Sequence, residues 1–383
     1  MAFISPDGDL EQFFLKDYSV IDELSPVGTL WSWGSNNSGQ LGNNSLNRES
    51  SPVQTVSGGY NWKSISNGYS HISSIKTDGS LWTWGNNDSG QLGDNTIVSK
   101  SSPIQIIPGS TNWKLIDNGS YIFAAIKTDG TLWLCGDNGL GQLGDNTNVN
   151  KSTPIQVSGG GTNWKLVSGG KYHTAAIKTD NTLWLWGYNA YGQLGDNTTT
   201  SKSTPVQISG GGYNWKLISS GQEYNAAIKT DGTLWLWGKN NFGQLGDNSR
   251  TTKITPVQTT PGGTNWRSVS CGSIHTAAIK TDGTLWLWGS NADGKLGNNT
   301  TSNKSTPIQT IAGGTNWKVV SIGEWHTGAI KTDGTLWVWG LNTDGQLGDN
   351  TTDNKSSPIQ TVAADTNWKV IDIKGSSTSA ISF

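Results

Sequence analysis

Charge is scarce in this sequence. Only 14% of its 383 residues are charged, and the formal net charge is −2; an average soluble domain is roughly 25% charged. So little charge gives no overall electrostatic reason to bind nucleic acid or an anionic membrane. The chain is also unlike a disordered one, because disorder accompanies high charge and few aromatic residues, whereas this sequence contains 21 Trp.

Long apolar runs and cysteines are also rare. No apolar run approaches the roughly 18 residues that a membrane-spanning helix needs. The N-terminal residues Met1–Asp7 lack a basic stretch followed by an apolar core, so we do not expect a signal peptide. The two cysteines, Cys135 and Cys271, occupy core positions of different repeats, and we therefore expect buried thiols rather than a disulfide.

A repeat of 51 residues runs through almost the whole chain. An Asn-Trp pair recurs seven times, and the phrase Leu-Trp-x-Trp-Gly recurs at the same spacing, with Cys135 replacing one Trp. No insertion or deletion interrupts the spacing, so each unit must be the same supersecondary structure, related to the next by a constant rotation. The Trp residues of the pair are Trp62, Trp113, Trp164, Trp215, Trp266, Trp317 and Trp368.

Within a unit the pattern predicts four short antiparallel strands. Most units carry Asp-Gly between the second and third of these, which is the strongest short hairpin signal. A long polar loop then leads to a proline such as Pro205, which fits an edge strand that needs no hydrogen-bond donor there. Four strands in about 50 residues form one propeller blade. In residues 164–207 the first three strands are Trp164–Ser168, His173–Lys178 and Thr182–Gly187.

The two ends of the chain are complementary halves of one unit. The repeat begins with a second half at Gly28–Gly34 and finishes with a first half at Trp368–Phe383. We therefore predict that one blade combines strands from both termini and closes a ring. The predicted fold is all-β: a seven-bladed β-propeller of four-stranded antiparallel blades over residues 27–383, preceded by a short N-terminal arm, residues 1–26.

The phrase Gly-x-x-His-x-x-Ala-Ile-x-x-Asp-Gly-x-Leu-Trp-x-Trp-Gly, followed by x-Asn-x-x-Gly-Gln-Leu-Gly, resembles the repeat of the regulator of chromosome condensation family, also called α-tubulin suppressor-like. The resemblance covers residues 28–383 and implies a seven-bladed propeller with a terminal clasp. It does not carry the function. The family's founding member is a nucleotide exchange factor for a small GTPase with a wedge-like excursion and a basic tail, but here the spacing leaves no room for a wedge and the arm is acidic. Near-identical Asn/Thr-rich units behind an acidic arm are also similar to propellers of tailed-phage virions.

Four histidines share one position of the repeat: His71, His173, His275 and His326. Metal ligands must converge within a few ångströms, and ring-related positions do so only at the axis. We therefore favour hydrogen bonds to a neighbouring blade over a metal site, and we predict neither metal nor cofactor. No Ser-His-Asp or Cys-His pair stands out, so we expect no enzyme; an acidic and basic pair at the mouth of the channel would instead point to a lyase-like activity.

Recurring aspartates and lysines also have two interpretations. The loop aspartates could bind Ca²⁺ or form turns with their own backbone, and we favour turns. The lysine rings could meet a polyanion, but lysines also protect strand edges, and we favour a solvated rim. The aspartates are Asp94, Asp145, Asp196, Asp247 and Asp349, and the three lysine rings begin at Lys63, Lys76 and Lys100.

Positions at which the repeats differ are the best candidates for binding a partner, because positions that the fold requires keep the same residue in every unit. They carry aromatic residues beside polar ones, which a protein or glycan partner can contact, although loop tips also drift neutrally. The candidate recognition residues are Tyr172, Tyr188, Tyr191, Lys239, Phe242, Glu324 and Trp325, with Lys171, Glu223 and Tyr224 at related positions.

The N-terminal arm is the other part without repeats. Leu10, Phe13, Phe14, Tyr18 and Ile21 follow the spacing of one helical face, and Asp9 can cap such a helix. The arm either packs on its own propeller or anchors the molecule to a larger assembly, and we favour an anchor that docks to another protein.

Together these features predict a non-catalytic display module. Its loops recognise a protein, a glycan or another cell-surface ligand, and its arm docks it into an assembly such as a phage virion, placing it in a virion or on an extracellular surface. The alternative is a cytoplasmic regulatory propeller that binds a small GTPase or another protein. Neither interpretation involves nucleic acid or a membrane.

Overall fold

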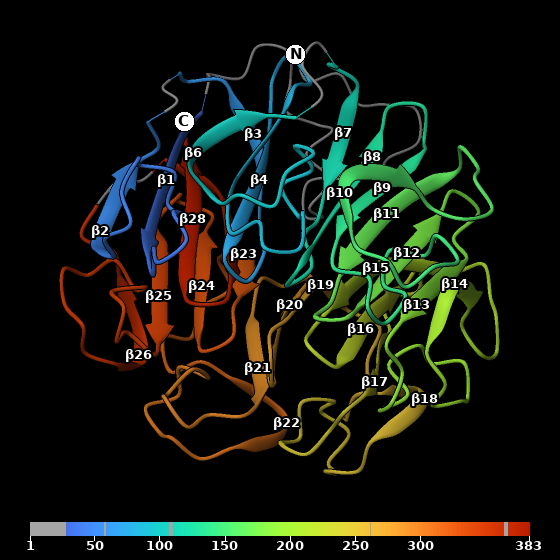
Figure 1. Cartoon of the computed structure of the whole chain (residues 1–383). Coiled ribbons are helices and arrows are strands. Elements are labelled where there is room, and N and C mark those ends of the chain that lie inside the picture. The colour runs from blue at the N-terminus through green and yellow to red at the C-terminus, as the bar shows by residue number, and fades with distance from the viewer. Residues whose placement is uncertain (1–27, 57–58, 107–109, 261, 364–366) are drawn as a thin grey trace, which may run out of the picture.

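A computed structural model describes residues 28–56, 59–106, 110–260, 262–363 and 367–383. In these residues, 28 strands form seven four-stranded sheets around a common axis (Figure 1). The predicted all-β, seven-bladed propeller is confirmed, and the described residues contain no helix that could span a membrane. The arm residues Leu10, Phe13, Phe14, Tyr18 and Ile21 lie outside the described part of the chain.

The strands follow the repeat from blade to blade. The first three complete blades contain β3 (Trp62–Asn67), β4 (His71–Lys76), β5 (Leu81–Gly85), β6 (Lys100–Gln105); β7 (Trp113–Ile116), β8 (Ile122–Lys127), β9 (Leu132–Gly136), β10 (Lys151–Gln156); and β11 (Trp164–Gly169), β12 (His173–Lys178), β13 (Leu183–Gly187), β14 (Lys202–Gln207). The next three contain β15 (Trp215–Ser220), β16 (Tyr224–Lys229), β17 (Leu234–Gly238), β18 (Lys253–Gln258); β19 (Trp266–Cys271), β20 (His275–Lys280), β21 (Leu285–Gly289), β22 (Lys304–Gln309); and β23 (Trp317–Ile322), β24 (His326–Lys331), β25 (Leu336–Gly340), β26 (Lys355–Gln360).

The seventh blade joins the two ends of the chain, as predicted. It has the strand order β2-β1-β28-β27, with β1 (Thr29–Gly34) and β2 (Glu49–Gln54) from the start and β27 (Trp368–Lys374) and β28 (Ser377–Ser382) from the end. Strands β1 and β28 pair antiparallel through six residue pairs, from Thr29↔Ser382 to Gly34↔Ser377. We call this sheet the clasp blade.

Each blade is ordered from the axis to the rim. The first strands, such as β11, β15, β19 and β23, contact their counterparts in neighbouring blades around the axis, while fourth strands such as β14 and β22 lie at the periphery (Figure 1). Pro205 therefore lies on an edge strand, as its position in the repeat predicted.

The core fills the space between consecutive blades. The second Trp of each Leu-Trp-x-Trp phrase is fully buried; Trp186 packs edge-on against Trp164, and its indole Nε1 donates to the carbonyl oxygen of Gln142 in the preceding blade at 2.9 Å. Cys135 replaces this Trp in one blade and is buried as a free thiol, as is Cys271. The two cysteines are thus buried and unbridged, as predicted.

The propeller has two different faces. On one, which we call the hairpin face, lie the tight hairpins between second and third strands and the links between blades. On the other, the loop face, lie the short turns between first and second strands and the long loops between third and fourth strands. The sequence variation singled out above falls on the loop face.

Candidate functional site

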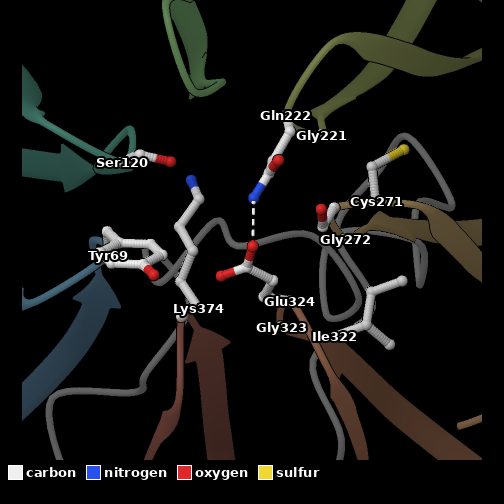
Figure 2. Close-up of a pocket in the computed structure, with 12 residues that line it drawn as sticks. Tyr69, Ser120, Gly221, Gln222, Cys271, Gly272, Ile322, Gly323, Glu324 and Lys374 are labelled. Atoms are coloured by element: carbon white, nitrogen blue, oxygen red, sulfur yellow. Dashed lines mark hydrogen bonds between the residues drawn. The ribbon is translucent and has the colours of Figure 1, made fainter. Parts of the chain in front are cut away.

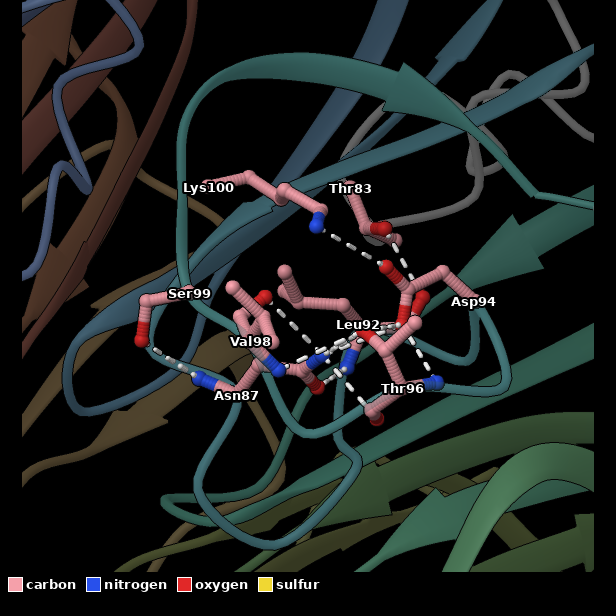
Figure 3. Close-up of polar contacts among 8 residues, drawn as sticks. All are labelled: Thr83, Asn87, Leu92, Asp94, Thr96, Val98, Ser99 and Lys100. Atoms are coloured by element: carbon pink, nitrogen blue, oxygen red, sulfur yellow. Dashed lines mark hydrogen bonds and ion pairs between the residues drawn. The ribbon is translucent and has the colours of Figure 1, made fainter.

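A buried asparagine organises each long loop of the loop face. Asn87 donates through Nδ2 to Asp94 Oδ1 at 3.0 Å and to the carbonyl oxygens of Thr96 and Val98, and its Oδ1 accepts from the backbone N–H of Leu92 at 2.9 Å (Figure 3). Sequence reasoning missed this role, although every unit has an Asn two residues after the Gly that ends its third strand. The equivalents, all fully buried, are Asn36, Asn138, Asn189, Asn240, Asn291 and Asn342.

The loop aspartates belong to the same networks. Asp94 Oδ1 accepts from the backbone N–H and hydroxyl of Thr96 at 3.0 and 2.7 Å, and Oδ2 lies 3.6 Å from Lys100 Nζ (Figure 3). Burial tends to raise the pKa of Asp94, but hydrogen bonds from Thr96 and Asn87 outweigh burial and the pKa lies below its ordinary value. This geometry agrees with the predicted turn. Within the described ranges, no group of three or more His, Cys, Asp or Glu side chains is placed to hold a metal ion.

The shared histidine position connects neighbouring blades. His173 Nε2 lies 3.0 Å from Asn225 Oδ1, and His275 Nε2 lies 3.1 Å from Thr327 Oγ1 in the following blade. Both rings are fully buried, and burial lowers the pKa of His173 to about 4. The predicted bonds between blades are confirmed for His173, His275 and His326. His71 is equally buried, but neither nitrogen of its ring has a hydrogen-bond partner among the described residues.

Five tyrosines form a continuous line across three blades of the loop face. Tyr121 stacks on Tyr172 at 5.7 Å between ring centroids, and Tyr172 meets Tyr188 edge-on at 6.3 Å. Tyr69 extends the line on one side, 5.9 Å from Tyr121, and Tyr191 extends it on the other, 6.3 Å from Tyr188. All five side chains remain partly exposed. We call these five residues the tyrosine belt.

A charged pair in the next blade ends the belt. The Lys239 ammonium lies 4.5 Å from the centre of the Tyr191 ring and forms an ion pair with Glu223. The cation–π contact and the ion pair fix the lysine over the aromatic surface. The belt and this pair therefore present aromatic faces, hydroxyl groups and one charge pair across four blades.

Two tyrosines of the belt, Tyr121 and Tyr69, have a raised pKa. Burial, with the neighbouring Tyr172 and Tyr69, raises the pKa of Tyr121 to about 12. The negative charge of Glu324 and partial burial raise the pKa of Tyr69 above its usual value. These two hydroxyls are therefore favoured as hydrogen-bond donors, beside the apolar area of their rings.

A small depression lies at the axial end of the loop face, next to Tyr69 (Figure 2). Its rim includes Glu324, which accepts a hydrogen bond from Gln222 Nε2 at 3.0 Å. Lys374, from β27, donates to the carbonyl oxygens of Asn118 and Gly169 in two other blades. Lys374 therefore connects the clasp blade to two blades that are not its neighbours in the ring.

The sequence-predicted candidates divide into three groups. Tyr172, Tyr188, Tyr191 and Lys239 come together in the belt and its charged end. Glu324 lies in the axial depression. Trp325 makes a cation–π contact with Lys295, whose Nζ lies 4.7 Å from the centre of the Trp325 ring. Phe242 occupies the loop position of Tyr191 one blade further on and is partly exposed.

The structure also corrects and extends the set. Tyr224, grouped with the variable surface positions, is fully buried, and its hydroxyl bonds Thr276 Oγ1 in the next blade at 3.0 Å. A large aromatic ring there fills the space that histidine fills elsewhere. Tyr69 and Tyr121 were missed. Tyr121 lies one repeat before Tyr172, so the period could have found it. Tyr69 lies one position earlier in its repeat, and only the rotation between blades brings its ring against Tyr121.

The lysine rings are more specific than a solvated rim. Lys100 pairs with a loop aspartate, as do Lys151, Lys253 and Lys355. Lys178 lies between two indoles, 4.9 Å from the centre of Trp164 and 4.3 Å from that of Trp184. The same stacking recurs at Lys76, Lys127, Lys229, Lys280 and Lys331.

Comparison with known proteins finds relatives along most of the chain. The ultraviolet-B receptor UVR8 of Arabidopsis thaliana is 29% identical over 302 residues, which cover 77% of this chain and 69% of the receptor. The human probable E3 ubiquitin-protein ligase HERC4 is 31% identical over 198 residues, covering 50% of this chain but 19% of the ligase.

Solved structures share the fold at lower identity. Prp20p from Saccharomyces cerevisiae superposes with a TM-score of 0.85 at 19% identity, covering 100% of this chain and 96% of that one. Human WBSCR16 superposes with a TM-score of 0.81 at 18% identity, covering 93% and 100%. The family model of the regulator of chromosome condensation (RCC1) repeat matches seven consecutive stretches: 27–75, 78–126, 129–177, 180–228, 231–279, 282–330 and 333–381. The chain therefore belongs to the RCC1 repeat family.

Proposed function

We propose that this protein is a non-catalytic, intracellular regulatory propeller that binds a protein partner on its loop face through the tyrosine belt. The single observation that carries the proposal is the unbroken contact of five partly exposed tyrosine rings, ending in the pair Lys239–Glu223. Rings held by their neighbours lose little conformational freedom on binding, and tyrosine combines apolar area with a hydroxyl.

The relatives support a binding role. The solved structure of Prp20p was described together with its binding to Gsp1p and histones. A Caenorhabditis elegans relative, 28% identical over 343 residues, is named as an X-linked retinitis pigmentosa GTPase regulator homolog, although the match covers 24% of it. A small GTPase is therefore the first partner class to test. The expected virion component receives no support from these relatives.

The interior chemistry also supports a non-catalytic role. The histidines of the repeat are buried in contacts between blades, and burial raises the pKa of the Cys271 thiol to about 12. A reactive cysteine needs the opposite shift and solvent access. The Lys374 ammonium at the axial depression is engaged by two backbone carbonyls.

The test compares matched tyrosine pairs on the two faces. Tyr172→Ala with Tyr188→Ala removes the centre of the belt, and Tyr60→Ala with Tyr213→Ala removes two strongly exposed tyrosines of the hairpin face. Partners co-purified from the source cells with wild-type protein are titrated against all three forms by calorimetry. We expect the belt variant to bind at least about 30-fold more weakly, the effect of roughly 2 kcal/mol, and the hairpin-face variant to bind normally. Normal binding by the belt variant would refute the proposal.

A further inference from the structure

Seven cationic side chains encircle the axis on the hairpin face. Each follows the Trp at the beginning of its blade's innermost strand, so the repeat brings all seven to equivalent positions around the axis. Arg267 reaches into the next blade and donates to the carbonyl oxygens of Trp317 and Lys318 at 2.8 and 3.3 Å. We call these residues the cation ring: Lys63, Lys114, Lys165, Lys216, Arg267, Lys318 and Lys369.

The charges of the ring act on one another. Burial lowers the pKa of Lys318, and the positive charges of Lys369 and Arg267 lower it further. Among the described residues, no carboxylate lies within the 4.0 Å ion-pair distance of Lys63, Lys114, Lys318 or Lys369. Like charges held close together repel, so an acidic group placed among them gains more than it would beside a single lysine.

The surrounding face does not neutralise the ring. The six lysines stacked between tryptophans also lie there. The side-chain carboxylates of the described residues on this face are the six hairpin aspartates: Asp78, Asp129, Asp180, Asp231, Asp282 and Asp333. In the described part of the propeller, thirteen cationic side chains thus accompany six side-chain carboxylates on this face, in a chain whose overall net charge is −2. The described side chains therefore concentrate positive charge on one face.

The acidic N-terminal segment joins the propeller beside this ring. Residues 1–27 contain six carboxylates and one lysine. The first described residue, Gly28, bridges to the innermost strand β3, where the backbone N–H of Trp62 donates to the Gly28 carbonyl oxygen at 3.2 Å. Lys63 of the ring is the next residue. At up to roughly 3.3 Å per residue, the segment is long enough to reach every blade.

We propose that the carboxylates of residues 1–27 bind the cation ring, so that the N-terminal segment covers the axial end of the hairpin face of its own propeller. Tethering raises the effective concentration of the segment to the order of millimolar, so several weak ion pairs suffice. Salt screens such pairs. Docking of the arm to another protein, as the sequence analysis predicted, is the alternative that the experiment must distinguish. The inference goes beyond the binding role of the tyrosine belt and is independent of it, because the belt lies on the opposite face.

Distances between spin labels on the full chain test the location of the segment. Both native cysteines are buried, so labels go selectively to Ser19→Cys paired with Tyr213→Cys on the hairpin face, or with Thr352→Cys on the loop face. We expect a short, narrow distance distribution to residue 213 and a long one to residue 352. A broad distribution to both, or one that narrows only when a partner protein is added, would overturn the proposal.

Matched charge changes test whether the ring is what holds the segment. Neutralising Asp17, Asp22 and Glu23 by amide substitution, or reversing Lys114→Glu and Lys369→Glu, broadens the distribution to residue 213, as does high salt. Neutralising Asp88, Asp344 and Asp353 on the loop face changes net charge as much as the arm variant and leaves the distribution unchanged. By calorimetry, the arm variant binds inorganic tripolyphosphate about tenfold more tightly than wild type, because the ring is uncovered. Equal behaviour of the arm and loop-face variants would show that general charge, and not the ring, is responsible.

Discussion

The clasp blade and the six internal blades have the same four-stranded fold, but different interactions stabilise it. In an internal blade the second and third strands are joined by a tight hairpin, and a lysine such as Lys178 lies between two tryptophans at its base. In the clasp blade the hairpin is cut, and Ser382 stands at the lysine position. There Trp31 Nε1 donates to Ser382 Oγ at 3.1 Å, across the join between the chain ends.

The clasp replaces the lost connection with a longer ladder and a buried carboxylate. Its central strands pair through six residues on each side, whereas β12 and β13 pair through five. At the joint to the next blade, Asp372 Oδ2 accepts from the backbone N–H of Asn67 at 2.6 Å, where Ser66 Oγ makes the equivalent contact with Asn118 at 2.8 Å. The comparison teaches that strand pairing and contacts between blades, rather than chain connectivity, hold a blade in the ring.

The largest effect is expected from a cavity in the clasp. Ile381→Ala and Ile177→Ala remove equivalent, fully buried side chains from the clasp and from an internal blade. Each costs about 3–4 kcal/mol of unfolding free energy in chemical denaturation. Only Ile381→Ala should also increase cleavage by proteases under native conditions, because the clasp can open at its ends. Equal protease resistance of the two variants would mean that the clasp is as closed as a hairpin.

Acid is expected to weaken the joints that contain histidine. Burial lowers the pKa of His326, whose Nε2 lies 2.7 Å from Thr378 Oγ1 of the clasp blade, to about 3. The unfolded chain takes up the proton near pH 6.5 and the folded chain does not, so stability is complete above pH 6.5 and falls as the pH drops toward the folded pKa.

At pH 5 this histidine lowers the free energy of unfolding by about 2 kcal/mol. The variant His326→Ile copies Ile122 at the same position of another blade. Between pH 7 and pH 5, its free energy of unfolding in urea titrations should therefore fall by about 2 kcal/mol less than that of the wild type. Thr378 keeps a partner, because its hydroxyl also donates to the Gln346 carbonyl oxygen. An unchanged pH slope in this variant would show that the ring titrates normally in the folded state.

A smaller effect is expected at the tryptophan pair. Lys178→Ser, which gives an internal blade the clasp residue, should cost about 1 kcal/mol by losing the cation–π contacts. The reverse change, Ser382→Lys, should recover less than that, because Trp31 loses its hydrogen bond to Ser382. Guanidinium denaturation measures the free energy of unfolding of both variants. If Lys178→Ser leaves it unchanged, the stacking of lysine between tryptophans does not stabilise internal blades.

The smallest effect is expected at the one internal hairpin without glycine. Asn181 has φ of 62°, a left-handed conformation that glycine adopts in the other five hairpins. Asn181→Gly should raise stability by no more than about 0.5 kcal/mol, since asparagine tolerates this conformation well and the exposed bond from Lys165 Nζ is lost. A thermal shift measurement is sufficient, and a marked decrease would show that Lys165 matters more than backbone strain.

The fold could be predicted in detail because every unit repeats it. The seven Trp positions, the hairpins, the edge strand at Pro205 and the shared blade all follow from one period, and any single unit supplies the same pattern. The histidine contacts were predictable for the same reason. Positions related by one repeat meet at each joint, as His173 does with Asn225.

The candidate site was predicted only in part, because three of the four ring contacts in the belt join non-equivalent positions; only Tyr121 and Tyr172 share a position of the repeat. Tyr69, Tyr121 and Tyr188 occupy three different positions of the repeat, so the period gives no reason to group them. Tyr224 was placed with surface residues because aromatic character alone does not distinguish an exposed ring from one that fills a joint. Asn87 was overlooked, although it recurs in every unit, because its partners lie along a loop that shows neither strand nor helix periodicity.

The pairing of the clasp also fixes how the ring responds to mechanical load. Thr29 and Ser382, the outermost pair of the β1–β28 ladder, lie at the end from which both chain termini leave. A force pulling the termini apart acts on that pair first and then on each successive pair. The two strands are therefore unzipped one pair at a time, and not sheared along their length. A pulling experiment should therefore open the circle at low force, well before any internal blade yields.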